Sequence, residues 1–399
     1  MTQSKPLSGV KVLDLTRVLA GPYCAQMLFD LGAEVIKVEN PAHGDDSRLF
    51  QPFMANKSLY FESVNGGKKS LTLNMKAPGA VNVLKKLIAE TDVLVENFRP
   101  GVMAKFGLDY DNAKKINPRL IYASISGFGQ TGPDALKPSY DILAQARGGI
   151  MSLTGYPDGD PMMVGVSLSD VLAGVFAATA ITTALYRREK TNDGEHIDIS
   201  MLDCQVAMLE SAMMRYQATK IPPKPVGCRH ATEAPFQSFN ASDRPFVLAA
   251  IAGEAMFQRL CAAIGHPEIG TDERFSTTAA RHDNVEELGK ALQSVFITDT
   301  AAHWVDLLEK NAIPVSLIQD LKEVCEDPQI MARRMLVEMQ SPELKGLKTI
   351  ACPIKMNSLP DDGKTRPAAP DLGQDTDEIL RHLGLTDDDI AALKSDGVV

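Results

Sequence analysis

The sequence lacks the short motifs of several common enzyme classes. It has no G-x-S-x-G elbow of a hydrolase, no H-E-x-x-H zinc motif and no phosphate-binding P-loop. Its seven histidines show no metal-ligand spacing, so we expect no metal site. The first predicted strand is not followed by G-x-G-x-x-G, the glycine pattern that binds dinucleotides. A nicotinamide-dependent dehydrogenase is therefore disfavoured.

Cysteine pairs, basic runs and long apolar runs are also missing. The six cysteines are scattered without a C-x-x-C pair, which favours reduced thiols in a reducing compartment. Lys and Arg total 41 against 51 Asp and Glu, and no basic run stands out, so we expect no nucleic-acid partner. The longest apolar run, Val171–Tyr186, is shorter than the roughly 20 residues that span a bilayer, which favours a buried helix. Residues 1–6 show no targeting segment, and we expect a cytoplasmic protein without a membrane partner.

Strand and helix patterns alternate along the first half of the chain. Val10–Leu15 is an apolar strand, Gly21–Leu31 has helical spacing, and Val35–Val38 is a second strand, which together make a βαβ unit. The alternation continues with helices near 80–90, 110–115, 169–188 and 201–220, and with strands at 93–95, 120–126 and 196–200. The pattern predicts a doubly wound α/β lobe with a parallel sheet.

The second half of the chain differs in composition and in the order of its predicted elements. Ile221–Val226 contains three prolines and is typical of a linker. A more polar stretch follows, with a strand at 246–251 and helices near 253–264, 284–296 and 300–310. After Pro314 we expect a helix near 320–325, a strand at 349–354, a Pro/Asp/Gly-rich stretch at 359–372 and a terminal helical segment. Since 399 residues exceed the usual size of one core, we predict two lobes.

Three loops carry residues suited to ligand binding, although each also has an ordinary explanation. The turn Leu13–Pro22 follows a strand, where α/β proteins place ligands, but it is equally a plain connection. In Val95–Gly101, Arg99 is suited to gripping a phosphate and Phe98 to stacking on a base, unless the loop is a solvated turn with a core Phe. The glycines of Ser124–Pro133 allow close approach of a ligand, or simply make a flexible loop.

Asp170 stands at the start of the long apolar helix, in the segment Gly165–Gly174. Local propensity favours a helix N-cap or first-turn aspartate, which is a structural role. The same position also suits a nucleophile, because the helix dipole would keep the carboxylate ionised and Gly165 leaves room for a substrate. The residues alone leave both readings open.

Taken in order, these segments resemble the class III CoA-transferase family, also called the CaiB/BaiF type. The resemblance runs over almost the whole chain. It is carried by LDLTRVLAGP (13–22), LGAEVIKVE (31–39), LNMK (73–76), VENFRPG (95–101), SGFGQTGP (126–133), Tyr140-Asp141, VSLSDVLAG (166–174), Ile197–Asp203, Asp272-x-Arg274-Phe275, Asp327-Pro328-Gln329 and Leu372-Gly373-Gln374.

The resemblance implies an architecture that composition does not show. It implies an α/β fold in which residues 1–220 form the first part of a large Rossmann-like domain. Residues 225–325 would form a smaller α+β domain, and residues 326–399 would return to complete the large one. It also implies an interlocked homodimer.

The resemblance implies that CoA is transferred from an acyl-CoA donor, with succinyl-CoA or another short acyl-CoA as our first expectation, to a short dicarboxylate. Asp170 would form an aspartyl–acyl anhydride and then an aspartyl–CoA thioester. CoA would be a substrate rather than a tightly bound cofactor. CoA contacts carry over to Leu19, Ala20, Asn40, Leu73, Asn74, Met75, Lys76, Asn97, Phe98, Arg99 and Lys105, and binding also to Tyr140 and Asp141.

Two alternatives remain on the same fold. An acyl-CoA racemase needs a base on each face of the α-carbon, and that branch carries Gly-His-Asp where this chain has Ser139-Tyr140-Asp141, so transfer is favoured. A catalytically idle CoA-binding protein is disfavoured because the aspartate is present. Oxalate-using members carry a run of glycines where this chain has only Gly253, so we expect a longer acid such as succinate, with its second carboxylate on Arg48, Arg147 or Arg229.

Overall fold

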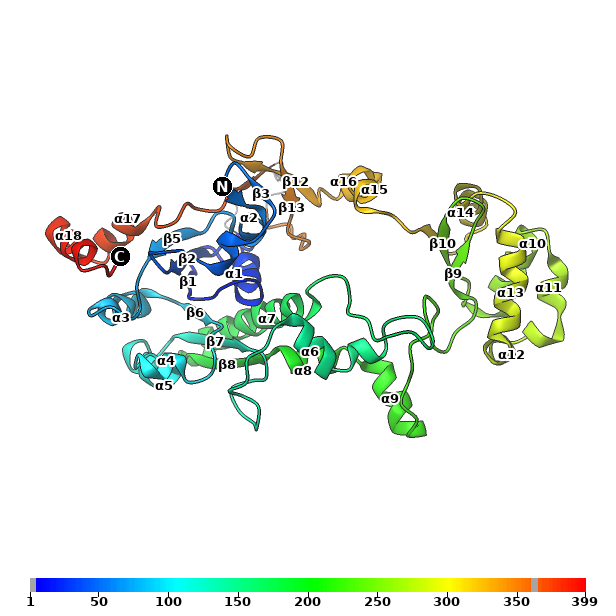
Figure 1. Cartoon of the computed structure of the whole chain (residues 1–399), viewed down its shortest axis with the longest axis horizontal. Coiled ribbons are helices and arrows are strands. Elements are labelled where there is room, and N and C mark those ends of the chain that lie inside the picture. The colour runs from blue at the N-terminus through cyan, green and yellow to red at the C-terminus, as the bar shows by residue number, and fades with distance from the viewer. Residues whose placement is uncertain (1–4, 360–364) are drawn as a thin grey trace. The chain divides into compact units, whose positions relative to one another are not determined.

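The computed structural model describes residues 5–359 and 365–399, and it divides into two compact units (Figure 1). Unit 1 comprises Met1–Ile150, Met163–Thr219 and Pro328–Val399. Unit 2 comprises Met151–Met162 and Lys220–Asp327. The first residues of the chain and part of the predicted Pro/Asp/Gly-rich stretch lie outside the described residues.

Unit 1 is built on a six-stranded sheet with the order β5-β2-β1-β6-β7-β8. Every neighbouring pair in it is parallel, which confirms the predicted mixed α/β class. The strand order turns back between β1 and β6, so the loops after these two strands face one crevice at the carboxyl edge. The strands are β1 (Lys11–Asp14), β2 (Glu34–Glu39), β5 (Lys69–Thr72), β6 (Val93–Glu96), β7 (Ile121–Ser126) and β8 (Glu195–Ser200).

Helices cover both faces of this sheet because its strands alternate buried side chains between two cores. Val12 packs with α1 and α7 in one core, whereas its neighbour Leu13 packs with α3 and the C-terminal helices in the other. By length and composition α7 could cross a membrane, yet Ala173, Ala177 and Ile181 of this helix are buried in the first core. The helices of unit 1 that precede its C-terminal part are α1 (Ala20–Asp30), α2 (Leu59–Asn65), α3 (Ala80–Glu90), α4 (Val102–Lys105), α5 (Tyr110–Ile116), α6 (Asp141–Arg147), α7 (Leu168–Thr191), α8 (Met201–Ala207) and α9 (Glu210–Thr219).

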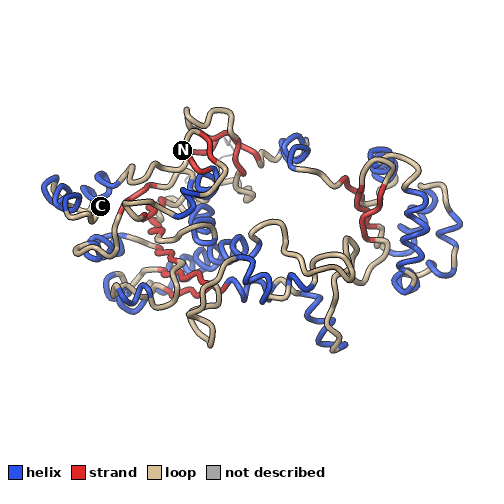
Figure 2. The backbone as a smooth tube through the Cα atoms, in the orientation of Figure 1, coloured by secondary structure: helices blue, strands red, loops and turns tan. Residues whose placement is uncertain are grey.

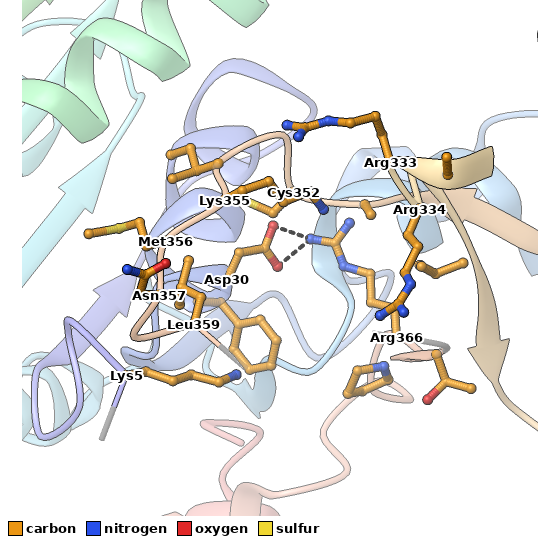
Figure 3. A pocket seen from close by; sticks show the side chains of 17 residues that line it. Lys5, Asp30, Arg333, Arg334, Cys352, Lys355, Met356, Asn357, Leu359 and Arg366 are labelled. Atoms are coloured by element: carbon orange, nitrogen blue, oxygen red, sulfur yellow. Dashed lines mark hydrogen bonds and ion pairs between the residues drawn. The ribbon is translucent and has the colours of Figure 1, made fainter. Parts of the chain in front are cut away.

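The C-terminal part of the chain, Pro328–Val399, is tied into unit 1 through polar contacts. The Arg366 guanidinium forms an ion pair with Asp30 at the end of α1, with a nitrogen–oxygen distance of 2.5 Å (Figure 3). The amide of Gly67 donates to the carbonyl of Ala368. This part contains α16 (Pro328–Ala332), β12 (Leu336–Gln340), β13 (Lys348–Ile350), β14 (Thr365–Pro367), α17 (Thr376–His382) and α18 (Asp387–Ser395); unit 1 also has the hairpin β3 (Phe53–Met54) and β4 (Lys57–Ser58).

Unit 2 packs helices around a three-stranded antiparallel sheet with the order β11-β10-β9 (Figure 2). Its core is aromatic: the ring of Phe296 lies 5.0 Å from Phe239, 5.1 Å from Phe246 and 5.3 Å from Trp304, between ring centroids. Its elements are β9 (Phe236–Asn240), β10 (Pro245–Ala249), α10 (Gly253–Ala263), α11 (Pro267–Thr271), α12 (Thr278–Asp283), α13 (Val285–Phe296), α14 (Ala301–Lys310), β11 (Val315–Leu317) and α15 (Leu321–Glu326).

Some elements differ from the prediction. The single helix expected from 201 to 220 is two helices, α8 and α9, separated by Met208 and Leu209; Glu210, the first residue of α9, has a φ of 24°. The strand expected at 349–354 ends at Ile350, because Pro353 has no amide hydrogen for a ladder. β5, β9, β11 and β12 were not predicted; they are at most five residues long and partly polar.

Candidate active site

A cavity of about 510 Å³ opens where the strand order of unit 1 turns back, and Asp170 lies in its wall. We call it the Asp170 cavity. The loop after β1 and the loop after β6 both contribute, as expected for the carboxyl edge of a doubly wound sheet. Its lining residues are Arg17–Ala20, Asp46, Phe50, Asn97–Pro100, Ile125–Gly127, Ala135, Lys137–Tyr140, Asp170 and Met201.

A second cavity of about 370 Å³ adjoins the first, because Arg17 and Phe98 line both. The Arg17 guanidinium lies 5.7 Å from the centroid of the Phe98 ring. We call this the adjoining cavity. Its lining residues are Leu15–Arg17, Val38–Asn40, His43–Asp45, Leu73–Lys76, Phe98, Val102 and Phe106. Together the two cavities provide room for a long substrate that starts among the loops after β2 and β5 and ends at Asp170.

The loops after β1 and β6 are bound to each other by one side chain. The Asn97 amide accepts from the Arg17 backbone N–H at 2.9 Å and donates to the Arg17 carbonyl at 2.8 Å. The loop after β6 is also fixed by a local hydrogen bond, since the amide of Phe98 donates to the carboxylate of Glu96, the last residue of β6, at 2.8 Å. The two walls of the cavity are therefore held in one arrangement.

Asp170 is the third residue of α7, whose N-cap is Ser167, so it is a first-turn acid rather than the cap itself. The backbone amide of Ser169, in this first turn, donates a hydrogen bond to the carboxylate of Asp141 at 2.7 Å. Burial, and then the negative charge of Asp141, raise the pKa of Asp170 to about 7. The expectation that this carboxylate is held ionised is therefore not met near neutral pH, because burial raises its pKa and the charge of Asp141, which accepts from the Ser169 amide, adds to the effect. Among the described residues, the Asp170 carboxylate has neither an ion-pair partner nor a hydrogen-bond donor.

The structure brings most of the predicted site residues to these two cavities. Leu19, Ala20, Asn97, Phe98, Arg99, Tyr140 and Asp170 line the Asp170 cavity, and Asn40 and Leu73, Asn74, Met75 and Lys76 line the adjoining one. Two predicted residues line neither cavity. Lys105 is at the exposed end of α4, and Asp141 binds the first turn of α7 beside Asp170.

Sequence reasoning missed several residues of the cavity wall and misplaced the expected cations. Arg17 and Lys137 line the Asp170 cavity; Arg17 lies within the recognised segment Leu13–Pro22, where other residues drew attention, and Lys137 lies shortly after the segment Ser124–Pro133. Of the arginines expected to hold an acceptor carboxylate, Arg48 is paired with Glu39 at 2.7 Å and Arg147 with Asp134 at 2.6 Å, and neither lines the cavity. Arg229 belongs to unit 2, where it pairs with Glu286 at 3.3 Å.

Unit 1 has another cavity, of about 580 Å³, around the Asp30–Arg366 ion pair (Figure 3). Its one thiol among the lining residues is Cys352, and burial raises the pKa of this thiol, so no reactive thiolate is favoured there. Within residues 5–359 and 365–399, no three His, Cys, Asp or Glu side chains gather as a metal site would require. The Asp170 cavity is thus the candidate active site.

Comparison with known proteins agrees with this geometry. Residues 7–376 match the model of CoA-transferase family III. The chain belongs to this family. An acetyl-CoA:oxalate CoA-transferase of Acetobacter aceti is 45% identical over 370 residues, which are 92% of this chain and 93% of the relative. A human succinyl-CoA:glutarate CoA-transferase is 39% identical, over 100% of this chain and 91% of the relative.

A solved structure supports the same assignment. The crystal structure of a CAIB/BAIF family protein from Brucella suis is 38% identical and superposes with a TM-score of 0.84, over 96% of this chain and 100% of that chain. The resemblance seen in the sequence is thereby confirmed, and this chain is a CoA-transferase of family III.

Proposed function

We propose that this CoA-transferase carries CoA from succinyl-CoA, or another short acyl-CoA, to a short dicarboxylate, with Asp170 as the covalent nucleophile. The observation that carries the proposal is the state of Asp170. It lines a cavity at the carboxyl edge of the sheet, and its carboxylate lacks a cation or hydrogen-bond donor among the described residues. A poorly solvated carboxylate of this kind is a stronger nucleophile toward an activated acyl group than one held in an ion pair.

The transfer proceeds in four exchanges that need no external proton or oxidant. An Asp170 oxygen attacks the donor's thioester carbon and the carbon–sulfur bond breaks. CoA departs as the thiolate, and an aspartyl–acyl anhydride is formed. The thiolate then attacks the Asp170 carbonyl carbon, which releases the donor acid and leaves an aspartyl–CoA thioester. The acceptor carboxylate displaces the thiolate to form a second anhydride. Finally the thiolate attacks the acceptor's acyl carbon, which yields the new acyl-CoA and restores Asp170.

The adjoining cavity is the proposed site for the nucleotide end of CoA. Leu73–Lys76 and Asn40 line it, and Phe98 between the two cavities offers an aromatic face. Lys76 and Arg99 supply positive charge for the phosphates, which a cation recognises by charge and, for Arg, by paired hydrogen bonds. In this arrangement the thioester end of the substrate points to Asp170. Lys105, which lines neither cavity, stays a weaker candidate for phosphate contact.

The acceptor's second carboxylate is proposed to lie near Arg17 or Lys137, which line the Asp170 cavity together with Arg99. Both are paired with acidic side chains that a bound carboxylate would have to displace: Arg17 with Asp46 at 3.1 Å and Lys137 with Asp134 at 2.6 Å. The relatives named for oxalate and for glutarate differ in chain length, and both acids belong in the test.

We also propose that the enzyme is an interlocked homodimer in the cytoplasm. Large apolar side chains are exposed along α7 and α9, including Phe176 at 41%, Tyr186 at 65% and Met214 at 68% exposure. Monomeric proteins seldom expose apolar surface of this kind without a partner. Light scattering should give twice the mass of 43.2 kDa, and a monomer at micromolar concentration would contradict the proposal.

The proposed function is tested with purified protein and a panel of donors and acids. Succinyl-, acetyl- and formyl-CoA are each offered with oxalate, succinate, glutarate and a monocarboxylate, and CoA exchange is followed by chromatography. Intact mass after hydroxylamine or borohydride trapping should show an adduct in the wild type and none in Asp170→Ala, and this variant should keep CoA binding while losing turnover. No adduct with any donor would refute Asp170 as nucleophile. Loss of α-deuterium from a 2-methylacyl-CoA without CoA transfer would instead identify a racemase.

A further inference from the structure

The turn between β1 and α1 contains a residue in an unfavourable backbone conformation. Val18 has a φ of 68°, which L-residues rarely adopt. It is the one β-branched residue among the described non-glycine positions with positive φ. Such a conformation persists only where surrounding contacts enforce it, and it tends to occur at functional sites.

Two buried side chains enforce it. The amide of Val18 donates to both carboxylate oxygens of Asp45, at 3.1 and 3.3 Å. The carbonyl of Thr16 accepts from the Lys37 Nζ at 2.8 Å. Lys37 and Asp45 are themselves an ion pair of 2.8 Å with no exposed side-chain surface. One ion pair thus binds the turn on both sides of Arg17.

Both members of this pair stay charged near neutral pH. Burial opposes ionisation of Asp45, but Lys37 and hydrogen bonds from Ser47 outweigh it and lower the pKa of Asp45 to about 2. Burial likewise opposes the charge of Lys37, but Asp14 and Asp45 outweigh it and raise the pKa of this lysine. The constraint on the turn is therefore permanent under working conditions.

Lys37 reaches no ligand itself. It lines neither cavity, and Asp45 lines only the adjoining one. The turn that they hold does line the Asp170 cavity, from Arg17 to Ala20. We propose that Lys37 and Asp45 are positioning residues, which hold Val18 in its left-handed conformation and so fix the turn 16–20 against the thioester bound at Asp170. This inference rests on the proposed role of Asp170.

A buried ion pair can also serve stability alone, and the chain offers a matched control. Arg366 and Asp30 form a pair of 2.5 Å whose side chains are 10% and 14% exposed, on a different edge of unit 1. Neither residue lines the Asp170 cavity. Arg366→Met should therefore lower the thermal midpoint while leaving kcat per folded molecule unchanged.

The decisive variants are Lys37→Met and Asp45→Ala, compared with Asp45→Asn, which keeps an oxygen for the Val18 amide. Steady-state kinetics and single-turnover formation of the Asp170 adduct are measured well below each thermal midpoint. We expect kcat and the adduct rate to fall at least about 10-fold in Lys37→Met and Asp45→Ala, with KM for the acyl-CoA changed less than about 3-fold, because small misplacement costs rate more than binding. Asp45→Asn should recover most of the loss seen in Asp45→Ala.

The design separates the possible failures. If a single variant does not fold, Lys37→Met/Asp45→Asn removes both charges together and keeps the acceptor for Val18, and the same kinetic readouts apply. Unchanged kcat in folded Lys37→Met, Asp45→Ala or the double variant, or a loss no larger than that of Arg366→Met, would overturn the positioning role. Absence of an Asp170 adduct in the wild type would instead overturn the proposed function on which it rests.

Discussion

The raised pKa of Asp170 predicts a specific dependence of stability on pH. A carboxyl whose pKa is higher in the folded than in the unfolded state binds its proton more tightly when folded. It therefore favours folding at low pH, and this contribution is lost as the pH rises through the folded pKa. The Asp170→Asn side chain cannot ionise, so the free energy of unfolding of this variant should depend less on pH than that of the wild type. The variant should become progressively more stable than the wild type between about pH 4 and pH 7.

The size of the effect follows from the shift. The pKa rises from 3.8 to about 7, and each unit corresponds to about 1.4 kcal/mol, so the full difference is about 4 kcal/mol. Because Asp170 is only partly buried, this figure is an upper bound. Integrating over the titration, more than half of the difference accrues between about pH 5 and pH 8, where the protein is convenient to handle.

The assay is urea unfolding of wild type and Asp170→Asn at a series of pH values and at one fixed protein concentration, since a dimer's midpoint depends on concentration. Asp193→Asn, at an exposed aspartate after α7, is the control and should track the wild type at every pH. A difference between wild type and Asp170→Asn that stays constant from pH 5 to pH 8 would refute the claim that burial and Asp141 hold this group protonated near neutrality.

Two further predictions follow from contacts near Asp170. Asp141→Asn keeps an oxygen for the Ser169 amide but removes the charge, so the pKa of Asp170 should fall and the acidic limb of the kcat profile should move to lower pH; an unmoved limb would contradict the role of Asp141. Gly174→Ala places a Cβ 2.9 Å from the Ala20 carbonyl oxygen and 3.2 Å from the Cys24 nitrogen, so it should destabilise the protein by about 1–3 kcal/mol by forcing α7 from α1. Gly165→Ala, whose added Cβ meets no atom within 4 Å, is the matched control in thermal melts. Equal losses of stability in both variants would show that the contact between α7 and α1 does not cause the effect.

The fold was readable where local patterns were strong. VKVLDL and VIKV are apolar runs bounded by turn residues, and they became β1 and β2 in a parallel sheet. β5 was missed because Lys69–Thr72 is short and half polar, and only its place between β2 and the C-terminal part of the chain makes it a strand. Such an element depends on tertiary pairing rather than on its own propensity.

The candidate site shows the same limit. The loops that line the two cavities were recognised because each follows a strand, and topology brings the ends of β1 and β6 together. The partners of individual charged side chains were not recognised from the sequence, because they come from distant segments. Lys37 stands in an apolar strand, which was a usable sign of a buried cation, but nothing nearby in sequence pointed to the Thr16 carbonyl. Arg48 was expected at the acceptor and is instead bound to Glu39, nine residues before it.

The raised pKa of Asp170 also bears on the proposed reaction. A carboxylate kept ionised by the dipole of α7 would be well stabilised, and that stabilisation would have to be given up when it attacks a thioester. Asp141 instead binds the amide of Ser169, and burial leaves the ionised form of Asp170 poorly solvated, with a pKa of about 7. With that pKa, about half of the molecules would carry the ionised form that we propose as the nucleophile at neutral pH, and that form has less solvation to lose. Since the proposed attacking group is the carboxylate, single-turnover acylation should rise with pH up to about 7 and level off above it. A rate that is flat from pH 5 to pH 8 would mean that Asp170 is ionised throughout, and the stability difference described above would then be absent as well.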